Sequence, residues 1–120
     1  MIKYTNETAF AAIVEFFSRP GAQLAKTGSL GLCHYRHPDN PAIRCAVGCL
    51  IPDTEYRVDF ESKGIDEIYT AIPSLWGVSS ELLLACQCAH DESDTVHDFL
   101  KALENIKENM EIGLYKGNDD

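Results

Sequence analysis

The segment Ser93–Glu111, SDTVHDFLKALENIKENME, carries the clearest structural signal in the chain. Its apolar residues recur at spacings of three and four, which is the period of one face of an α-helix. Ser93 or Asp94 suits the N-cap position, because each side chain offers an oxygen to the free N–H groups of the first turn. The sequence therefore predicts an amphipathic helix, whose apolar face holds Val96, Phe99, Leu100, Leu103, Ile106 and Met110.

Other segments predict helices by the same period. Residues 5–18 place four apolar residues on one stripe, with Thr5 or Asn6 as N-cap and a Pro-Gly pair after the end. Ser79 or Ser80 caps a helix over residues 81–90, and a shorter isoleucine stripe stops at Pro73. Together these segments predict a mostly α, small single-domain fold over residues 1–120, with residues 113–120 as a frayed tail.

The middle of the chain allows one short β-hairpin around residues 32–50. Residues 32–36 are suited to a strand, and residues 37–41 contain two prolines with Asp and Asn, which is turn chemistry. Residues 42–51 are either the partner strand or a short buried helix, and we slightly favour the helix. The small residues Ala46 and Gly48 suit a close approach of two backbones.

The charge of the chain is strongly asymmetric. Residues 1–50 hold five Lys/Arg and three Asp/Glu, whereas residues 51–120 hold five Lys/Arg and sixteen Asp/Glu, which gives a net charge of −9. Nucleic acids and anionic membranes attract basic surfaces, so the sequence predicts neither as a direct partner. It favours a protein partner with a basic surface, although an acidic surface also simply keeps a protein soluble.

The compartment is predicted to be the cytosol. No basic segment followed by an apolar one marks a secretory signal, and no apolar run approaches the ~20 residues that span a bilayer. The five cysteines are an odd number, and in a reducing compartment we expect thiols or metal ligands, not a disulfide framework.

One hypothesis for the chemistry of this chain is a metal site formed by cysteine and histidine side chains. Cys33, Cys45, Cys86 and His90 supply the ligand types of a structural tetrahedral zinc site, but no paired C-x2-C knuckle accompanies them. The competing interpretation is that these cysteines are small buried apolar residues and that no cofactor is bound. We favour the second interpretation.

Nucleophilic catalysis is another hypothesis. Cys33 would act as the nucleophile, His90 as the base, and Asp91 or Asp53 as the group that orients the imidazole. The plainer interpretation places His90 at a helix C-terminus, where the helix dipole favours it and its ring packs on the core. We therefore lean towards a protein that is not an enzyme.

Acidic residues gather in residues 53–67 and on the exposed side of the last helix. Arg36 and Asp53 (or Glu55) are expected to form a structural ion pair, and Gly48 is expected to be structural too. Trp76 either fills a corner of the core, which we favour, or anchors an interface. The predicted partner-binding residues are Asp59, Glu61, Asp66, Glu67, Glu104, Glu108 and Glu111.

Two blocks of the sequence resemble an uncharacterised family of small proteins encoded by tailed phages and prophages. The first block is C-x-Y-R at residues 33–36 followed by C-A-x-G-x-L-I-x-D-x-x-Y at residues 45–56, and the second is L-x-x-x-Q-x-x-H-D at residues 83–91. The resemblance implies a phage origin and no particular chemistry. Together with the acidic surface, the resemblance predicts an accessory protein that binds a host protein as an inhibitor or anti-defence modulator, through a face that mimics nucleic acid. A homodimer is also compatible with the sequence.

Overall fold

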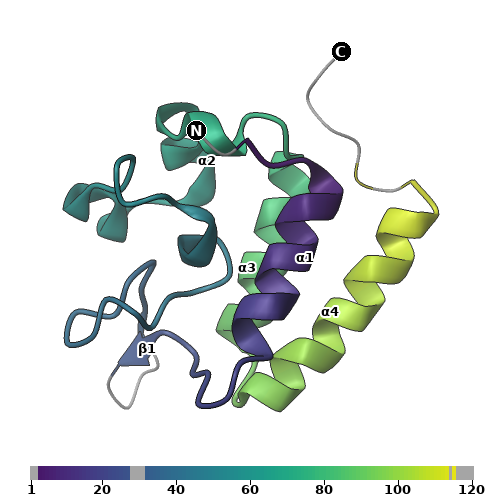
Figure 1. The fold of residues 1–120 in the computed structure, drawn as a ribbon, viewed down its shortest axis with the longest axis horizontal. Helices are drawn as coiled ribbons and strands as arrows, with labels where there is room; N and C mark the ends of the chain where they lie inside the picture. The colour runs from purple at the N-terminus through teal and green to yellow at the C-terminus, as the bar shows by residue number, and fades with distance from the viewer. Residues whose placement is uncertain (1–2, 28–31, 114, 116–120) are drawn as a thin grey trace.

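A computed structural model of the chain describes residues 3–27, 32–113 and 115. Long helices form one half of the molecule, and loops with short helical turns form the other (Figure 1). The predicted mostly α, small single-domain fold is confirmed. Among the described residues, no helix is both long and apolar enough to cross a membrane. The elements are α1 (Asn6–Phe17), β1 (Lys26–Thr27), β2 (Leu32–Cys33), η1 (Gly48–Leu50), η2 (Val58–Ser62), α2 (Ile65–Ile68), η3 (Tyr69–Ala71), η4 (Pro73–Leu75), α3 (Ser80–Glu92) and α4 (Val96–Glu111).

Side-chain caps set the start of α1 and of α3. The Thr5 side chain accepts a hydrogen bond from the Thr8 amide, and the Thr5 amide donates to the Thr8 hydroxyl in return. Ser79 caps α3 by accepting from the Leu82 amide. The isoleucine stripe before Pro73 forms α2 and then the 3-10 turn η3. These helices therefore begin where free N–H groups meet a suitable oxygen.

The cap of α4 differs from the prediction. Thr95, not Ser93 or Asp94, accepts a hydrogen bond from the Asp98 amide, at 3.1 Å. Ser93 belongs to the end of α3 instead, because its hydroxyl donates to the Ala89 carbonyl at 2.6 Å. Several capping residues in a row leave the start of a helix ambiguous by one or two positions in sequence.

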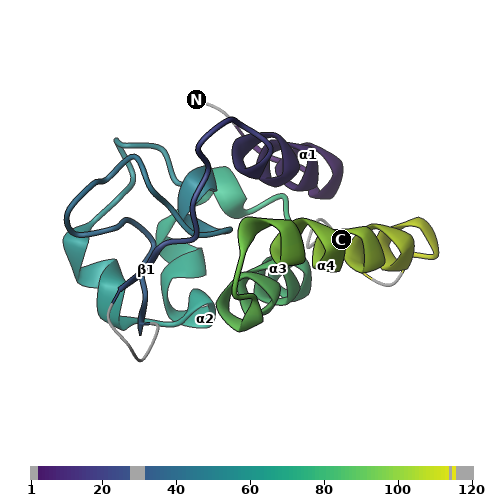
Figure 2. The ribbon, with the colours of Figure 1, turned by 90° about the horizontal axis from the view of Figure 1, so that it is seen from below.

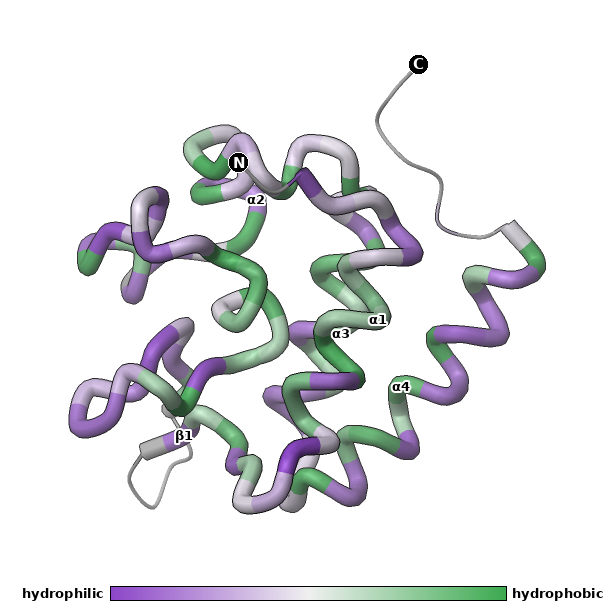
Figure 3. The backbone as a smooth tube through the Cα atoms, viewed as in Figure 1, coloured by the Kyte–Doolittle hydropathy of each residue, from purple (hydrophilic) through white to green (hydrophobic). Residues whose placement is uncertain are grey.

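The core extends from the three long helices into the loop half, where residues 45–47, Ile68 and Leu75 are also fully buried. Phe17 of α1 meets Phe99 of α4 edge to face, with ring centroids 4.8 Å apart. Figure 2 shows the three long helices grouped on one side of the molecule, and Figure 3 shows hydrophobic and hydrophilic segments alternating along α4. Each helix buries one face of its amphipathic pattern. The buried members include Phe10, Ile13, Leu82, Leu83, Cys86, Leu103 and Ile106.

Residues 42–51 form neither a long strand nor a long helix. The expected hairpin contact is reduced to one antiparallel bridge, Arg36 with Arg44, and the chain then turns into η1. The two-stranded sheet instead pairs β1 with β2, with Lys26 opposite Cys33. Residues 45–47 are fully buried, so the apolar run gives no period that distinguishes strand from helix. A Cβ on Gly48 would lie 2.0 Å from the Tyr35 carbonyl oxygen, which explains the glycine.

The end of α4 returns towards α1. Gly113 has a positive φ of 83°, a conformation that favours glycine just after a helix. The Tyr115 carbonyl then accepts a hydrogen bond from the Asn6 side chain at 3.1 Å. Residues 114 and 116–120, which hold most of the predicted frayed tail, lie outside the described residues.

Candidate functional site

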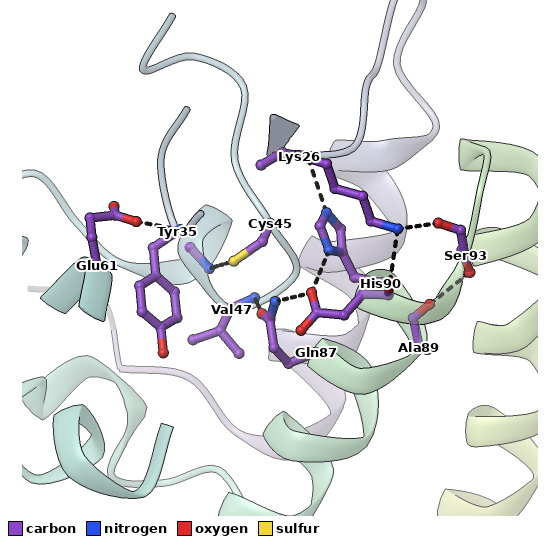
Figure 4. Close-up of polar contacts among 12 residues, drawn as sticks. Lys26, Tyr35, Cys45, Val47, Glu61, Gln87, Ala89, His90 and Ser93 are labelled. Atoms are coloured by element: carbon purple, nitrogen blue, oxygen red, sulfur yellow. Dashed lines mark hydrogen bonds and ion pairs between the residues drawn. The ribbon is translucent and has the colours of Figure 1, made fainter. Parts of the chain in front are cut away.

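A thiol, an imidazole and a carboxylate meet where β2 passes the C-terminal end of α3. Ligand atoms of Cys33, His90 and Asp91 all lie within 4.8 Å of one another. The neighbouring strand β1 is joined to the same helix end, since the Lys26 ammonium donates to the backbone carbonyls of Asp91 and Ser93 (Figure 4). The structure thus brings together Cys33, His90 and Asp91, the residues that the sequence suggested as nucleophile, base and orienting carboxylate.

His90 is completely buried, and both of its ring nitrogens are occupied. Its Nε2 lies 3.1 Å from the Ala25 backbone nitrogen, and its Nδ1 lies 3.0 Å from Asp91 Oδ1. A backbone N–H can only donate, so Nε2 must be the acceptor and Nδ1 must carry the proton that it donates to Asp91. The imidazole therefore joins the chain before β1 to α3, with its ring packed near Phe17 and Phe99.

Asp91 is the centre of this cluster. It accepts hydrogen bonds from His90, from Gln87 Nε2 at 2.9 Å and from the Cys33 thiol. Burial acts to raise the pKa of Asp91, but the three hydrogen bonds and the charge interaction with His90 together outweigh burial and lower the pKa below its usual value. Gln87 also accepts from the Val47 amide at 3.1 Å, so the cluster extends to the segment before η1 (Figure 4).

The arrangement does not activate Cys33 as a nucleophile. Burial, the hydrogen bond to Asp91 and the negative charge of Asp91 raise the pKa of Cys33 to about 11, although Lys26 acts in the opposite direction. A catalytic thiolate needs a lowered pKa and a base that faces the sulfur. Here the thiol donates to a carboxylate, and His90 has no ring nitrogen left to accept its proton. A pocket of about 250 Å³ beside Cys33 is also lined by Asp91 and Glu61.

The predicted four-ligand zinc set is not assembled within the part of the chain that the structure describes. The group that converges is Cys33, His90 and Asp91, without Cys45 or Cys86. Cys45 is a fully buried thiol whose sulfur accepts from the Gly48 amide at 3.2 Å. Burial raises the pKa of both Cys45 and Cys86 to about 12. A closed structural site needs four ligands, and His90 would have to give up a hydrogen bond to become one of them.

The acidic run at residues 53–67 is largely committed to internal contacts. Glu61 accepts hydrogen bonds from the backbone amides of Tyr35 and Arg36, at 2.9 and 3.0 Å, and from the Tyr56 hydroxyl. Arg36 lies 2.9 Å from Asp53, in the ion pair expected from the sequence, and its guanidinium stacks 4.0 Å above the Tyr56 ring. Glu61 and Asp53 therefore hold the loops together.

Three other acidic residues of this run are exposed. Asp59 pairs with Arg57 at 3.1 Å and with Lys63 at 3.5 Å, and the Glu67 side chain accepts from the Gly64 amide. Asp66 is exposed beside them. Local cations thus offset part of the negative charge that the sequence concentrates in residues 53–67.

Three glutamates of α4 lie on its exposed surface. Glu104, Glu108 and Glu111 are all exposed, and none of the ion pairs found among the described residues involves them. Of the predicted partner-binding residues, Asp66 and Glu67 of α2 are likewise exposed and outside these ion pairs, so the three glutamates of α4 are the larger of two such groups.

Sequence reasoning missed two features of the surface. A groove of about 780 Å³ separates α1 from α4, with Phe10, Val14 and Leu100 among its lining residues. Trp76 is 47% exposed, in place of the core position that we favoured, and its indole N–H donates to the Tyr69 carbonyl at 3.1 Å. In the sequence, the signal that could have indicated the groove is the apolar stripe of α1 and that of α4, both of which the structure leaves partly uncovered.

No protein-family model, no curated protein and no solved structure matches this chain. The two sequence blocks at residues 33–56 and 83–91 make structural contacts in this fold. Two of their contacts lie within the loop half, where Gly48 lies against the Tyr35 backbone and Arg36 pairs with Asp53. A third contact joins this half to α3, because Gln87 accepts a hydrogen bond from the Val47 amide. These residues of the two blocks therefore contribute to holding the fold together.

Proposed function

We propose that this chain is a phage-type accessory protein that binds a host protein with a basic surface in the host cytosol. It acts as an inhibitor or anti-defence modulator and not by catalysis. The observation that carries the proposal is the exposed surface of α4, where Glu104, Glu108 and Glu111 have no ion-pair partners among the described residues. Like charges at i, i+4 weaken a helix slightly, so the arrangement serves folding poorly and is better suited to attracting a cationic surface.

The internal use of the other candidate residues supports the same proposal. Cys33, His90 and Asp91 are engaged with one another and with the backbone, and the thiol carries a raised pKa. Reversing the charge of Glu61 would break three hydrogen bonds and disturb the fold. The test of an electrostatic surface therefore belongs on α4.

Affinity capture from host lysate, at low and high salt, tests the proposal. We expect one stoichiometric partner with a basic surface, retained at low salt and lost at high salt. The triple variant Glu104→Lys, Glu108→Lys, Glu111→Lys should lose this partner. The matched control is Asp39→Lys, Glu92→Lys, Asp94→Lys, which changes three exposed acids elsewhere and the net charge equally. Absence of a partner at both salt concentrations, or equal loss in both variants, would contradict the proposal.

A zinc-stabilised domain is the second candidate, because three ligand types converge at Cys33, His90 and Asp91. Zinc would have to displace the His90 proton that is donated to Asp91, and a fourth ligand would have to come from elsewhere. Metal analysis of protein purified without chelator distinguishes the candidates. One equivalent of zinc that is lost on Cys33→Ser substitution would favour this candidate over the first.

A further inference from the structure

The groove between α1 and α4 has an apolar floor on the surface of the molecule. Its floor includes Phe10 and Val14 from α1 and Leu100, Leu103 and Met110 from α4. Val14, Leu100 and Met110 are only partly buried, so the apolar stripes of the two helices are not fully covered. The groove has a volume of about 780 Å³ and follows α1 from Glu7 to Ser18. At 1.5 Å per residue this stretch is roughly 18 Å long, which is about three turns of a helix.

The rim of the groove is acidic. Glu7 and Glu15 line it on the α1 side, and Glu104 and Glu111 line it on the α4 side, against the single cation Lys107. Glu15 is paired with Arg19 at 2.9 Å, whereas the other three carboxylates belong to none of the ion pairs among the described residues. An apolar floor between negative walls is complementary to a segment with apolar residues on one face and cations on its flanks.

We infer that this groove is the docking site for a basic amphipathic helix of the partner protein. The helix lays apolar residues at i, i+3 or i+4 and i+7 on the floor, and its lysines or arginines lie along Glu7, Glu104 and Glu111. This inference rests on the proposed function, because it names the segment of the basic partner that the acidic surface receives. The charges disfavour a second copy of the chain that packs groove against groove, since an identical groove would bring a second acidic rim against the first.

Designed peptides test the groove without knowledge of the partner. The probe is a fluorescein-labelled helix of about 14 residues made of leucine and lysine, with the leucines on one face. One control peptide has the same composition in scrambled order, and another replaces lysine with glutamate. Fluorescence anisotropy at about 150 mM salt measures the dissociation constants, because at this ionic strength long-range attraction is largely screened.

A groove-filling variant separates the groove from the general acidic surface. Ala11 lines the groove and is exposed, so Ala11→Trp fills it without changing any charge. Asn105→Trp is the matched control, because it adds the same side chain at an exposed position of α4 outside the groove. Far-UV circular dichroism should show that both variants are folded. We expect the leucine–lysine helix to bind wild type and Asn105→Trp equally, and Ala11→Trp at least about tenfold more weakly.

Several results would overturn the inference. Equal binding of the probe to Ala11→Trp and wild type would do so, and so would equal affinity for the scrambled or the glutamate peptide. Dimerisation of the wild-type chain that Ala11→Trp abolishes would assign the groove to a second copy instead. The proposed function fails separately: lysate capture can fail while the groove still binds the probe, and a captured partner can tolerate Ala11→Trp but not the α4 triple variant.

Discussion

Replacing His90 by phenylalanine tests whether this residue is a structural connector. The substitution keeps an aromatic ring at the position whose centroid lies 5.9 Å from Phe17 and 5.6 Å from Phe99. It removes the acceptor of the Ala25 amide, which is fully buried, and an unsatisfied buried N–H costs about 1–3 kcal/mol. It also removes the donor to Asp91, whose side chain is 40% exposed and can take up water, so this loss costs about 0.5–1.5 kcal/mol.

The expected loss of unfolding free energy for His90→Phe is therefore about 1.5–4.5 kcal/mol. Urea unfolding, followed by circular dichroism, should show a lower midpoint with an unchanged m value. His90→Gln is the matched control, because its side-chain carbonyl can still accept from the Ala25 amide, and we expect about half of the loss. Stability of His90→Phe within about 0.5 kcal/mol of wild type would refute the assignment of His90 as a connector through its nitrogens.

Three further predictions concern the same scaffold. Because folding lowers the pKa of Asp91, its carboxylate stabilises the fold above the unfolded pKa of about 3.9 and loses this effect as the pH falls through the folded pKa. The unfolding free energy of Asp91→Asn should therefore be lower than that of wild type at pH 7 and should change less as the pH falls. Parallel plots of unfolding free energy against pH for the two proteins would contradict this. Alkylation at pH 8 should be slower at Cys33, with its pKa of about 11, than at a model thiol. Cys88→Ser should remove the most exposed reactive thiol. Fast labelling of Cys33 would support a catalytic role for this residue. Thermal unfolding should show that Gly48→Ala lowers the unfolding free energy by about 3 kcal/mol or more, because the added Cβ meets the Tyr35 carbonyl oxygen. Gly64→Ala should have little effect, because its added Cβ comes closest to the flexible Asp66 side chain. Equal losses of stability in the two variants would contradict the close approach of the Gly48 and Tyr35 backbones.

The long helices were predictable because their apolar residues repeat with a helical period. The stripes of residues 5–18, 81–90 and 96–110 correspond to α1, α3 and α4. The start of α4 was placed one or two residues early, because Ser93, Asp94 and Thr95 are all suitable caps and tertiary hydrogen bonds decide among them. Periodicity thus predicts that a helix exists more reliably than where it begins.

The candidate site was predictable only in part. Grouping Cys33 with His90 and Asp91 followed from residue types alone, and the structure does bring them together. The direction of the hydrogen bonds decides their chemistry, and it depends on the Ala25 amide, which no side-chain pattern can indicate. Gln87 gave a weak signal as a polar residue on the buried side of a predicted helix. The groove depends on how far α4 diverges from α1, which is set by packing across the whole core.

The role of the α4 glutamates can be measured as the association rate of the purified partner against ionic strength, by stopped-flow. For the wild-type chain we expect a rate constant that falls steeply between about 50 and 500 mM salt, because the exposed glutamates of α4 steer a basic surface. The Glu104→Lys, Glu108→Lys, Glu111→Lys variant should associate more slowly at low salt, with a flat or inverted salt dependence. The same rate constant and the same salt dependence for both proteins would contradict the account.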